Sequence, residues 1–96
     1  MNALNFDYFT AAVGERFDMC GGDESLPVQL VEASPLADSG REGGSFRLEF
    51  LGPAAPVIAQ GTYSFRRGGD ADDANDIFVC PIGRDEAGTR YEAVFY

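Results

Sequence analysis

The chain has 96 residues, of which 45% are hydrophobic and 24% are charged, so it describes one small globular domain with one core. Sixteen acidic residues against seven basic ones, with no histidine, give a net charge of −9. All seven basic residues are arginine, which excludes catalysis by histidine or lysine, zinc bound by histidine, and lysine-containing phosphate loops. Nucleic acid and anionic membrane surfaces are bound mainly through positive charge, so neither partner suits this chain.

The N-terminal residues and the two cysteines indicate the compartment. Residues 1–7 contain no basic region or continuous apolar run, and no segment approaches the roughly 20 apolar residues that cross a bilayer. We therefore expect a soluble cytoplasmic protein. Cys20 and Cys80 fit no short metal or redox spacing, and both lie in predicted strands. We expect buried free thiols, with a disulfide between the two as the alternative.

The first predicted element is a helix over about residues 5–13. Asn5 is a favourable N-cap, Phe6, Phe9 and Val13 share one face, and Gly14 stands where a glycine often ends a helix. A helix this short is marginal alone in water. We therefore expect the rest of the fold to cover its aromatic face.

Six short strands are predicted after Gly14, where the hydrophobic period changes to two. They cover about residues 15–20, 27–33, 45–51, 60–67, 76–82 and 89–96. The third strand has the clearest alternation, whereas the fifth has apolar residues on both faces and is expected to be buried on both sides. The pattern predicts a single mainly β domain over residues 1–96: a small antiparallel six-stranded β-barrel or sandwich with one short N-terminal helix.

An acidic loop before the fifth strand is a candidate metal site. Its oxygen-bearing side chains are of the kind that Ca²⁺ prefers: Asp70, Asp72, Asp73, Asn75 and Asp76. The spacing differs from an EF-hand, because Ala74 takes the fifth position counted from Asp70 and no glutamate follows at the twelfth. The competing interpretation is a solvated turn without a bound ion, and no cofactor is expected.

Four residues are candidates for contact with another molecule: Gln60, Tyr63, Tyr91 and Tyr96. Gly61 permits another backbone to approach closely, although we favour structural roles, with Gly61 in a bend and the Tyr63 hydroxyl bonded near the barrel mouth. Tyr91 and Tyr96 lie in the last strand. That strand either closes the barrel, which we favour, or pairs with a strand of a partner.

Three carboxylates are candidates for a glycosidase-like acid and base, namely Glu49, Asp85 and Glu92. Such catalysis needs one carboxyl group with a raised pKa inside a pocket. A barrel this small fills its interior with side chains, so we predict that the protein is not an enzyme.

The order of short motifs along the chain resembles a family of roughly hundred-residue bacterial proteins classed as a domain of unknown function. The most specific motifs are Gln-Gly-Thr-Tyr at 60–63 and Tyr-Glu-Ala-Val-Phe at 91–95. Further runs that carry the resemblance are residues 9–17, 30–36, 46–53 and 77–85. Members of that family are often encoded beside phage tail-collar-like proteins, which implies a protein partner in a tail or tail-derived assembly. Residues 68–75 depart from the family, whose members have a hydrophobic and glycine-rich hairpin there.

The functional prediction is a non-enzymatic structural or interaction protein, an accessory or adaptor of a phage tail or phage-derived assembly. It rests on the resemblance. The alternative is a small ligand- or Ca²⁺-binding module that uses residues 70–76. Mimicry of DNA by an acidic surface ranks last, because the sequence has no long face lined by carboxylates.

Overall fold

A computed structural model describes residues 6–21, 24–36, 45–55, 57–70 and 72–95. Within these residues every predicted element is present, with bounds that differ by a few residues. The helix and strands are α1 (Phe6–Ala12), β1 (Arg16–Gly21), β2 (Glu24–Pro35), β3 (Phe46–Gly52), β4 (Gly61–Arg67), β5 (Ala74–Asp85) and β6 (Gly88–Phe95). Both β2 and β5 run to 12 residues, and each contains an irregularity that hides part of its pattern in the sequence.

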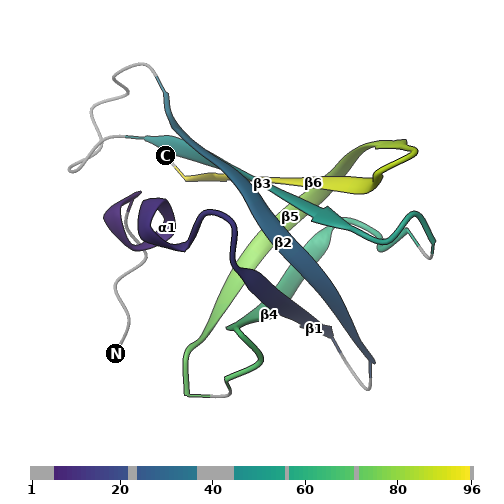
Figure 1. Ribbon diagram of the computed structural model, residues 1–96, viewed down its shortest axis with the longest axis horizontal. Helices are drawn as coiled ribbons and strands as arrows, with labels where there is room; N and C mark the ends of the chain where they lie inside the picture. Colours follow the sequence, from purple (N-terminus) through teal and green to yellow (C-terminus); the bar gives the residue numbers. More distant parts are fainter. Residues whose placement is uncertain (1–5, 22–23, 37–44, 56, 71, 96) are drawn as a thin grey trace.

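The six strands form a closed antiparallel barrel in the order β1-β2-β3-β6-β5-β4 (Figure 1). A barrel rather than a sandwich is therefore the fold. The last strand, β6, lies between β3 and β5, pairing Phe50 with Tyr91 on one side and Cys80 with Glu92 on the other. Barrel closure, the favoured role of this strand, is confirmed for β6.

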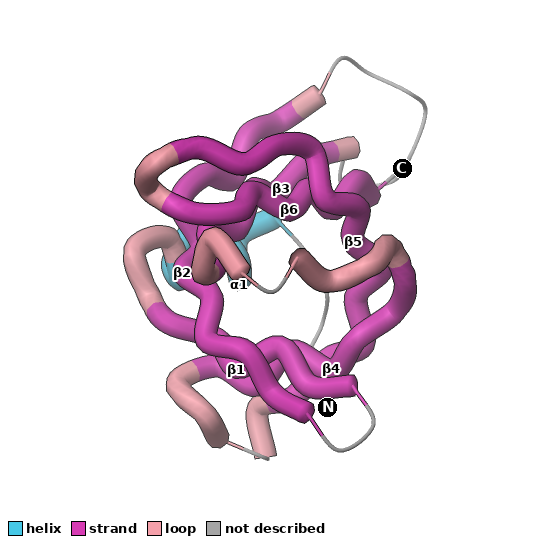
Figure 2. Tube along the Cα trace, turned by 90° about the vertical axis from the view of Figure 1, so that its right-hand side faces the viewer, coloured by secondary structure: helices cyan, strands magenta, loops and turns pink. Residues whose placement is uncertain are grey.

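Aromatic side chains fill the barrel and seal one of its ends. In the interior, the Phe50 ring lies 4.7 Å from that of Phe65 and 5.7 Å from that of Phe17, centroid to centroid. At the sealed end, Phe9 of α1 lies 5.7 Å from Phe95, which stacks on Phe46 at 4.6 Å. Figure 2 looks along the barrel toward α1, which lies behind the ring of strands. The sheet thus covers the aromatic face of the helix, as its length requires.

Val13 departs from the helix prediction. It lies just beyond the last residue of α1, and its side chain is 44% exposed instead of sharing the buried face of Phe9. Gly14, with a φ of +93°, turns the chain directly after it, and the Gly14 N–H donates to the Leu30 carbonyl at 2.7 Å. The helix therefore ends one residue earlier than its hydrophobic pattern suggests, because the chain must turn into β1.

Two register shifts explain where the alternation of the sequence blurs. One falls between Leu30 and Glu32 of β2, and the other between Pro81 and Gly83 of β5. A bulge adds one residue to a strand and re-aims the side chains beside it. The expectation that β5 is buried on both sides is wrong: Phe78 is 54% and Ile82 is 48% exposed.

Both cysteines are free thiols, as the sequence predicts, but they are half-buried instead of buried. Their strand neighbours Met19 and Val79 point into the barrel, so the alternation of a strand turns Cys20 and Cys80 outward.

Candidate functional site

The end of the barrel opposite α1 is crossed by the connection from β3 to β4. Two tyrosine hydroxyls form hydrogen bonds with the backbone of this connection. The hydroxyl of Tyr91, a fully buried side chain, accepts the Ile58 N–H at 2.9 Å, and the hydroxyl of Tyr63 donates to the Ala59 carbonyl at 2.6 Å. Two of the four candidate interaction residues therefore meet at one loop, where they fix its position over the barrel mouth.

The other two candidates lie elsewhere. Gln60 is exposed, and its side-chain oxygen lies 3.6 Å from the sulfur of Cys80 on the outside of the barrel. Tyr96 lies outside the described residues. The alternative role of Gly61, close approach by another group, is not seen: a Cβ on Gly61 would make an ordinary contact at 3.6 Å, whereas one on Gly21 would lie 2.6 Å from Cδ1 of Tyr63.

A hollow of about 670 Å³ lies beside this loop at the barrel mouth. Its walls combine apolar and polar groups, and Glu24 at the start of β2 adds a carboxylate. The apolar lining comes from Met19, Leu26, Val57, Ile58 and Tyr63. Val57 is 47% exposed and lines the hollow at the mouth.

The acidic loop between β4 and β5 directs its side chains apart. The Asp70 carboxylate accepts the N–H of Asp72 at 2.9 Å, and Asp73 accepts the Tyr8 hydroxyl at 2.7 Å. Asn75 has a buried side-chain nitrogen, whereas Asp76 is exposed. Over the described ranges no three His, Cys, Asp or Glu residues come together as metal ligands. Calcium binding here stays a prediction that the geometry does not favour.

Tyr8 connects α1 to this loop and to the end of β4. The Arg67 guanidinium lies over the Tyr8 ring, 5.2 Å from its centroid, and forms two hydrogen bonds with the Glu15 carboxylate at 2.7 and 2.9 Å. Partial burial first, and then the hydrogen bond and charge of Asp73, raise the pKa of Tyr8 to about 12, while Arg67 acts in the opposite direction. The cluster holds the helix against the barrel.

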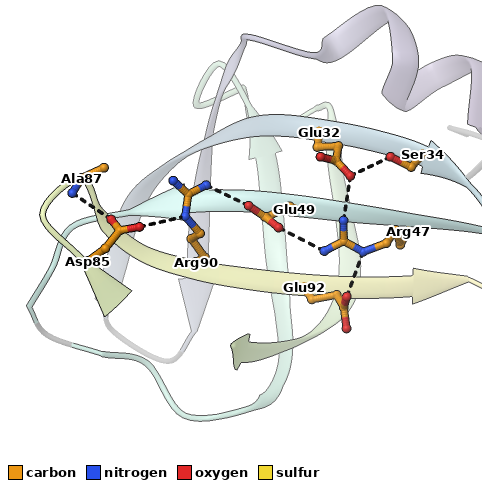
Figure 3. A network of polar contacts seen from close by, with 8 residues as sticks. All are labelled: Glu32, Ser34, Arg47, Glu49, Asp85, Ala87, Arg90 and Glu92. Carbon is orange, nitrogen blue, oxygen red and sulfur yellow. Dashed lines mark hydrogen bonds and ion pairs between the residues drawn. The ribbon is translucent and has the colours of Figure 1, made fainter. Parts of the chain in front are cut away.

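A network of ion pairs covers the outer face of β2, β3 and β6 (Figure 3). Arg47 of β3 contacts three carboxylates, those of Glu32 and Glu92 at 2.8 Å and of Glu49 at 3.1 Å. Glu49 also accepts from Arg90 at 2.8 Å, and Arg90 reaches Asp85 at 3.3 Å. The network therefore ties four strands together across the barrel wall.

Glu49, Asp85 and Glu92, the candidates for a glycosidase-like acid and base, all belong to this network. Partial burial raises the pKa of Glu49, but hydrogen bonds from Arg90 and Arg47 outweigh that effect and hold it below its ordinary value. The Ala87 N–H and then Arg90 lower the pKa of Asp85. Glu92 accepts from Arg47. A general acid needs the opposite shift, so the network favours a structural role for these groups.

The outer face of β5 differs from the rest of the wall. Its exposed apolar residues, Phe78 and Ile82, form what we call the β5 strip, and Val94 on the neighbouring β6 is 36% exposed. Thr62 of β4 lies opposite Phe78, and Glu92 of β6 lies opposite Cys80. Exposed apolar side chains on the outer face of one strand are candidates for a binding surface.

The architecture defines a small closed β-barrel with a helix at one end, a hollow at the other and an apolar strip on its wall. Residues 4–95 match the family described as "Domain of unknown function (DUF6916)", and the chain belongs to that family. No curated protein and no solved structure matches the chain. Among the described residues α1 is the one helix, and its seven residues are too few to cross a membrane.

Sequence reasoning missed the ion-pair network, the Tyr8 cluster and the hollow. The network had a visible signal, because Arg47 and Glu49 alternate outward on one strand and Arg90 and Glu92 on another. Pairing those two strands in register places the charges side by side. The hollow had no such signal, since it depends on where an irregular loop crosses the barrel.

Proposed function

We propose that this chain is a non-enzymatic adaptor that binds another protein through the β5 strip. The observation that carries the proposal is the exposure of Phe78 and Ile82 on the wall of a barrel that is already closed. Because each strand has two neighbours in the sheet, these side chains are not needed to complete the core. Their burial in a complex would add the apolar centre that protein interfaces require.

Charge indicates the chemistry of the partner. The chain carries −9, and four arginines, Arg16, Arg47, Arg67 and Arg90, already form ion pairs within the molecule. Asp76, on the same face as Phe78, is exposed, and Glu92 borders the strip. A partner with an apolar centre and a basic rim fits this surface best, because opposite charges speed association and exclude acidic competitors.

Two observations support the non-enzymatic part of the proposal. The interior is filled by aromatic and aliphatic side chains such as Phe17, Phe50 and Phe65. The carboxylates with lowered pKa values, Glu15, Glu49 and Asp85, are bonded to arginines. The resemblance to proteins encoded beside tail-collar-like proteins makes basic tail-type proteins the first partners to test, as components of a phage tail or phage-derived assembly.

The test is co-purification of the tagged chain with the tail-type proteins encoded beside its gene, co-expressed one at a time. We expect one of them to bind, and the double variant Phe78→Ser, Ile82→Ser to weaken binding by at least about tenfold. Val13→Ser is the matched control, since Val13 is similarly exposed but lies next to α1. Binding that survives the double variant would move the interface elsewhere. If no neighbour binds, the adaptor proposal fails.

A further inference from the structure

We propose that the hollow at the barrel mouth is a binding site for a small organic cation with an apolar body, such as an arylalkylammonium ion. The site is separate from the β5 strip, so it extends the proposed function instead of restating it. Its volume of about 670 Å³ falls in the range of ligand pockets, roughly 300–1,000 Å³.

The walls of the hollow are held in place before any ligand arrives. Tyr91 and Tyr63 bond the two loop residues Ile58 and Ala59, so the loop wall is tied to the barrel at consecutive residues. The Tyr63 ring lies so close to Gly21 that any larger residue there would displace it. A site with fixed walls binds without the entropic cost of ordering them.

The lining matches an apolar body. Met19 forms the buried floor, and Leu26, Ile58 and Tyr63 are half-buried around it. Val57 stands exposed at the mouth, where a ligand body would cover its methyl groups. Removing this apolar surface from water is the main source of affinity in such a site.

The polar groups select the charge of the ligand. Glu24, which lies opposite Gly21 at the start of β2, supplies a carboxylate. None of the described residues that line the hollow is basic, and the net charge of −9 repels anions. A carboxylate or phosphate ligand is therefore disfavoured, and an ammonium group beside Glu24 is favoured.

The experiment compares three ligands of similar size: phenethylammonium, phenethyl alcohol and phenylacetate. Each is titrated into the ¹⁵N-labelled protein, and backbone amide shifts are followed by NMR. We expect the ammonium ion to shift the amides of Met19, Leu26 and Ala59. It should bind about two- to fivefold more tightly than the alcohol, the range that an exposed ion pair supplies, and phenylacetate should bind most weakly.

Two pairs of variants test the assignment, all at exposed positions where the fold tolerates change. Val57→Ala should weaken binding about three- to fivefold, since the wall loses two methyl groups, whereas Val13→Ala should leave it unchanged. Glu24→Gln should abolish the preference for the ammonium ion over the alcohol, and Glu86→Gln, in the turn before β6, should not.

Each other outcome would overturn the proposal. Shifts confined to residues away from the hollow, or no shifts at all, would remove the site. Equal binding of all three ligands, or a charge preference that survives Glu24→Gln, would remove the selection for a cation. A loss of binding in Val13→Ala equal to that in Val57→Ala would show that the ligand associates with exposed apolar surface in general.

Discussion

The outer faces of β3 and β5 show two different uses of the same kind of surface. Both strands point alternate residues into one core, Leu48 and Phe50 from β3 and Ile77 and Val79 from β5. Outward, β3 presents Arg47 and Glu49, which bond to charged groups on the neighbouring strands. Outward, β5 presents Phe78 and Ile82, which are exposed.

This difference separates a surface that stabilises the barrel, the outer face of β3, from a surface that is available to a partner, the outer face of β5. On β3 each outward charge is satisfied within the molecule, so a second protein would have to break those ion pairs before it could use them. On β5 the apolar side chains Phe78 and Ile82 have no hydrogen bonds to lose when covered, and their burial releases water. The β3 face is therefore best understood as part of the fold, and the β5 face as the surface available for binding.

The largest expected contrast is between two phenylalanines, Phe50 pointing in and Phe78 pointing out. Phe50→Ala should lower the free energy of unfolding by about 3–5 kcal/mol, because it leaves a cavity among Phe17, Phe65 and their neighbours. Phe78→Ala should change it by less than about 1 kcal/mol, since half of its side chain already contacts water. Urea denaturation of both variants measures the difference. A large loss in Phe78→Ala would show that β5 is needed for the core after all.

The second contrast is between two arginines. Arg47→Met should cost about 2 kcal/mol, because three carboxylates lose their shared partner and repel one another. Arg66→Met, at an exposed position on β4, should stay within about 0.5 kcal/mol. Thermal and urea unfolding at neutral pH give both values.

Acid provides the control for the arginine contrast. The lowered pKa of Glu49 stabilises the fold above the pKa of the unfolded chain, and this contribution is lost as the pH falls through the folded-state value. The gap between Arg47→Met and the wild type should therefore shrink near pH 3, where most carboxylates bind protons. A gap that does not depend on pH would mean that Arg47 acts through the packing of its aliphatic stem.

The same two strands show how far the sequence predicts the structure. On β3 the strict alternation from Phe46 to Phe50 predicted the strand, its inward face and its outward face, because β3 pairs with β6 in a regular ladder and the bulge in its pairing with β2 lies on β2. On β5 the apolar residues on both faces suggested two-sided burial. Hydrophobicity alone does not distinguish a residue buried in the core from one kept at the surface, and the bulge at Ile82 adds a residue that a period of two does not describe.

The candidate site was predicted less well than the fold, for a physical reason. Tyr63 and Tyr91 were recognised as candidates, but their common contact with the β3–β4 connection depends on an irregular loop whose path the hydrophobic pattern does not describe. The acidic residues of 70–76 looked like one cluster in sequence. In the hairpin they separate, since the turn and the start of β5 point successive side chains in different directions.

The smallest expected effect concerns the contact between α1 and the residue before β5, where the Tyr8 phenol donates to Asp73. The pKa of Tyr8 is raised to about 12, whereas an unfolded tyrosine titrates near pH 10. The unfolded chain therefore loses this proton first. The stabilisation that this hydrogen bond supplies is fully present below about pH 10 and is lost as the pH rises toward 12.

The variant Tyr8→Phe lacks the hydroxyl and should be about 1 kcal/mol less stable than the wild type at pH 8. The difference in stability between the two proteins should close as the pH rises. Urea denaturation of both proteins across this range measures the gap, and a constant difference would show that α1 is held by packing of Phe9 on Phe95 and not by the Tyr8 hydrogen bond.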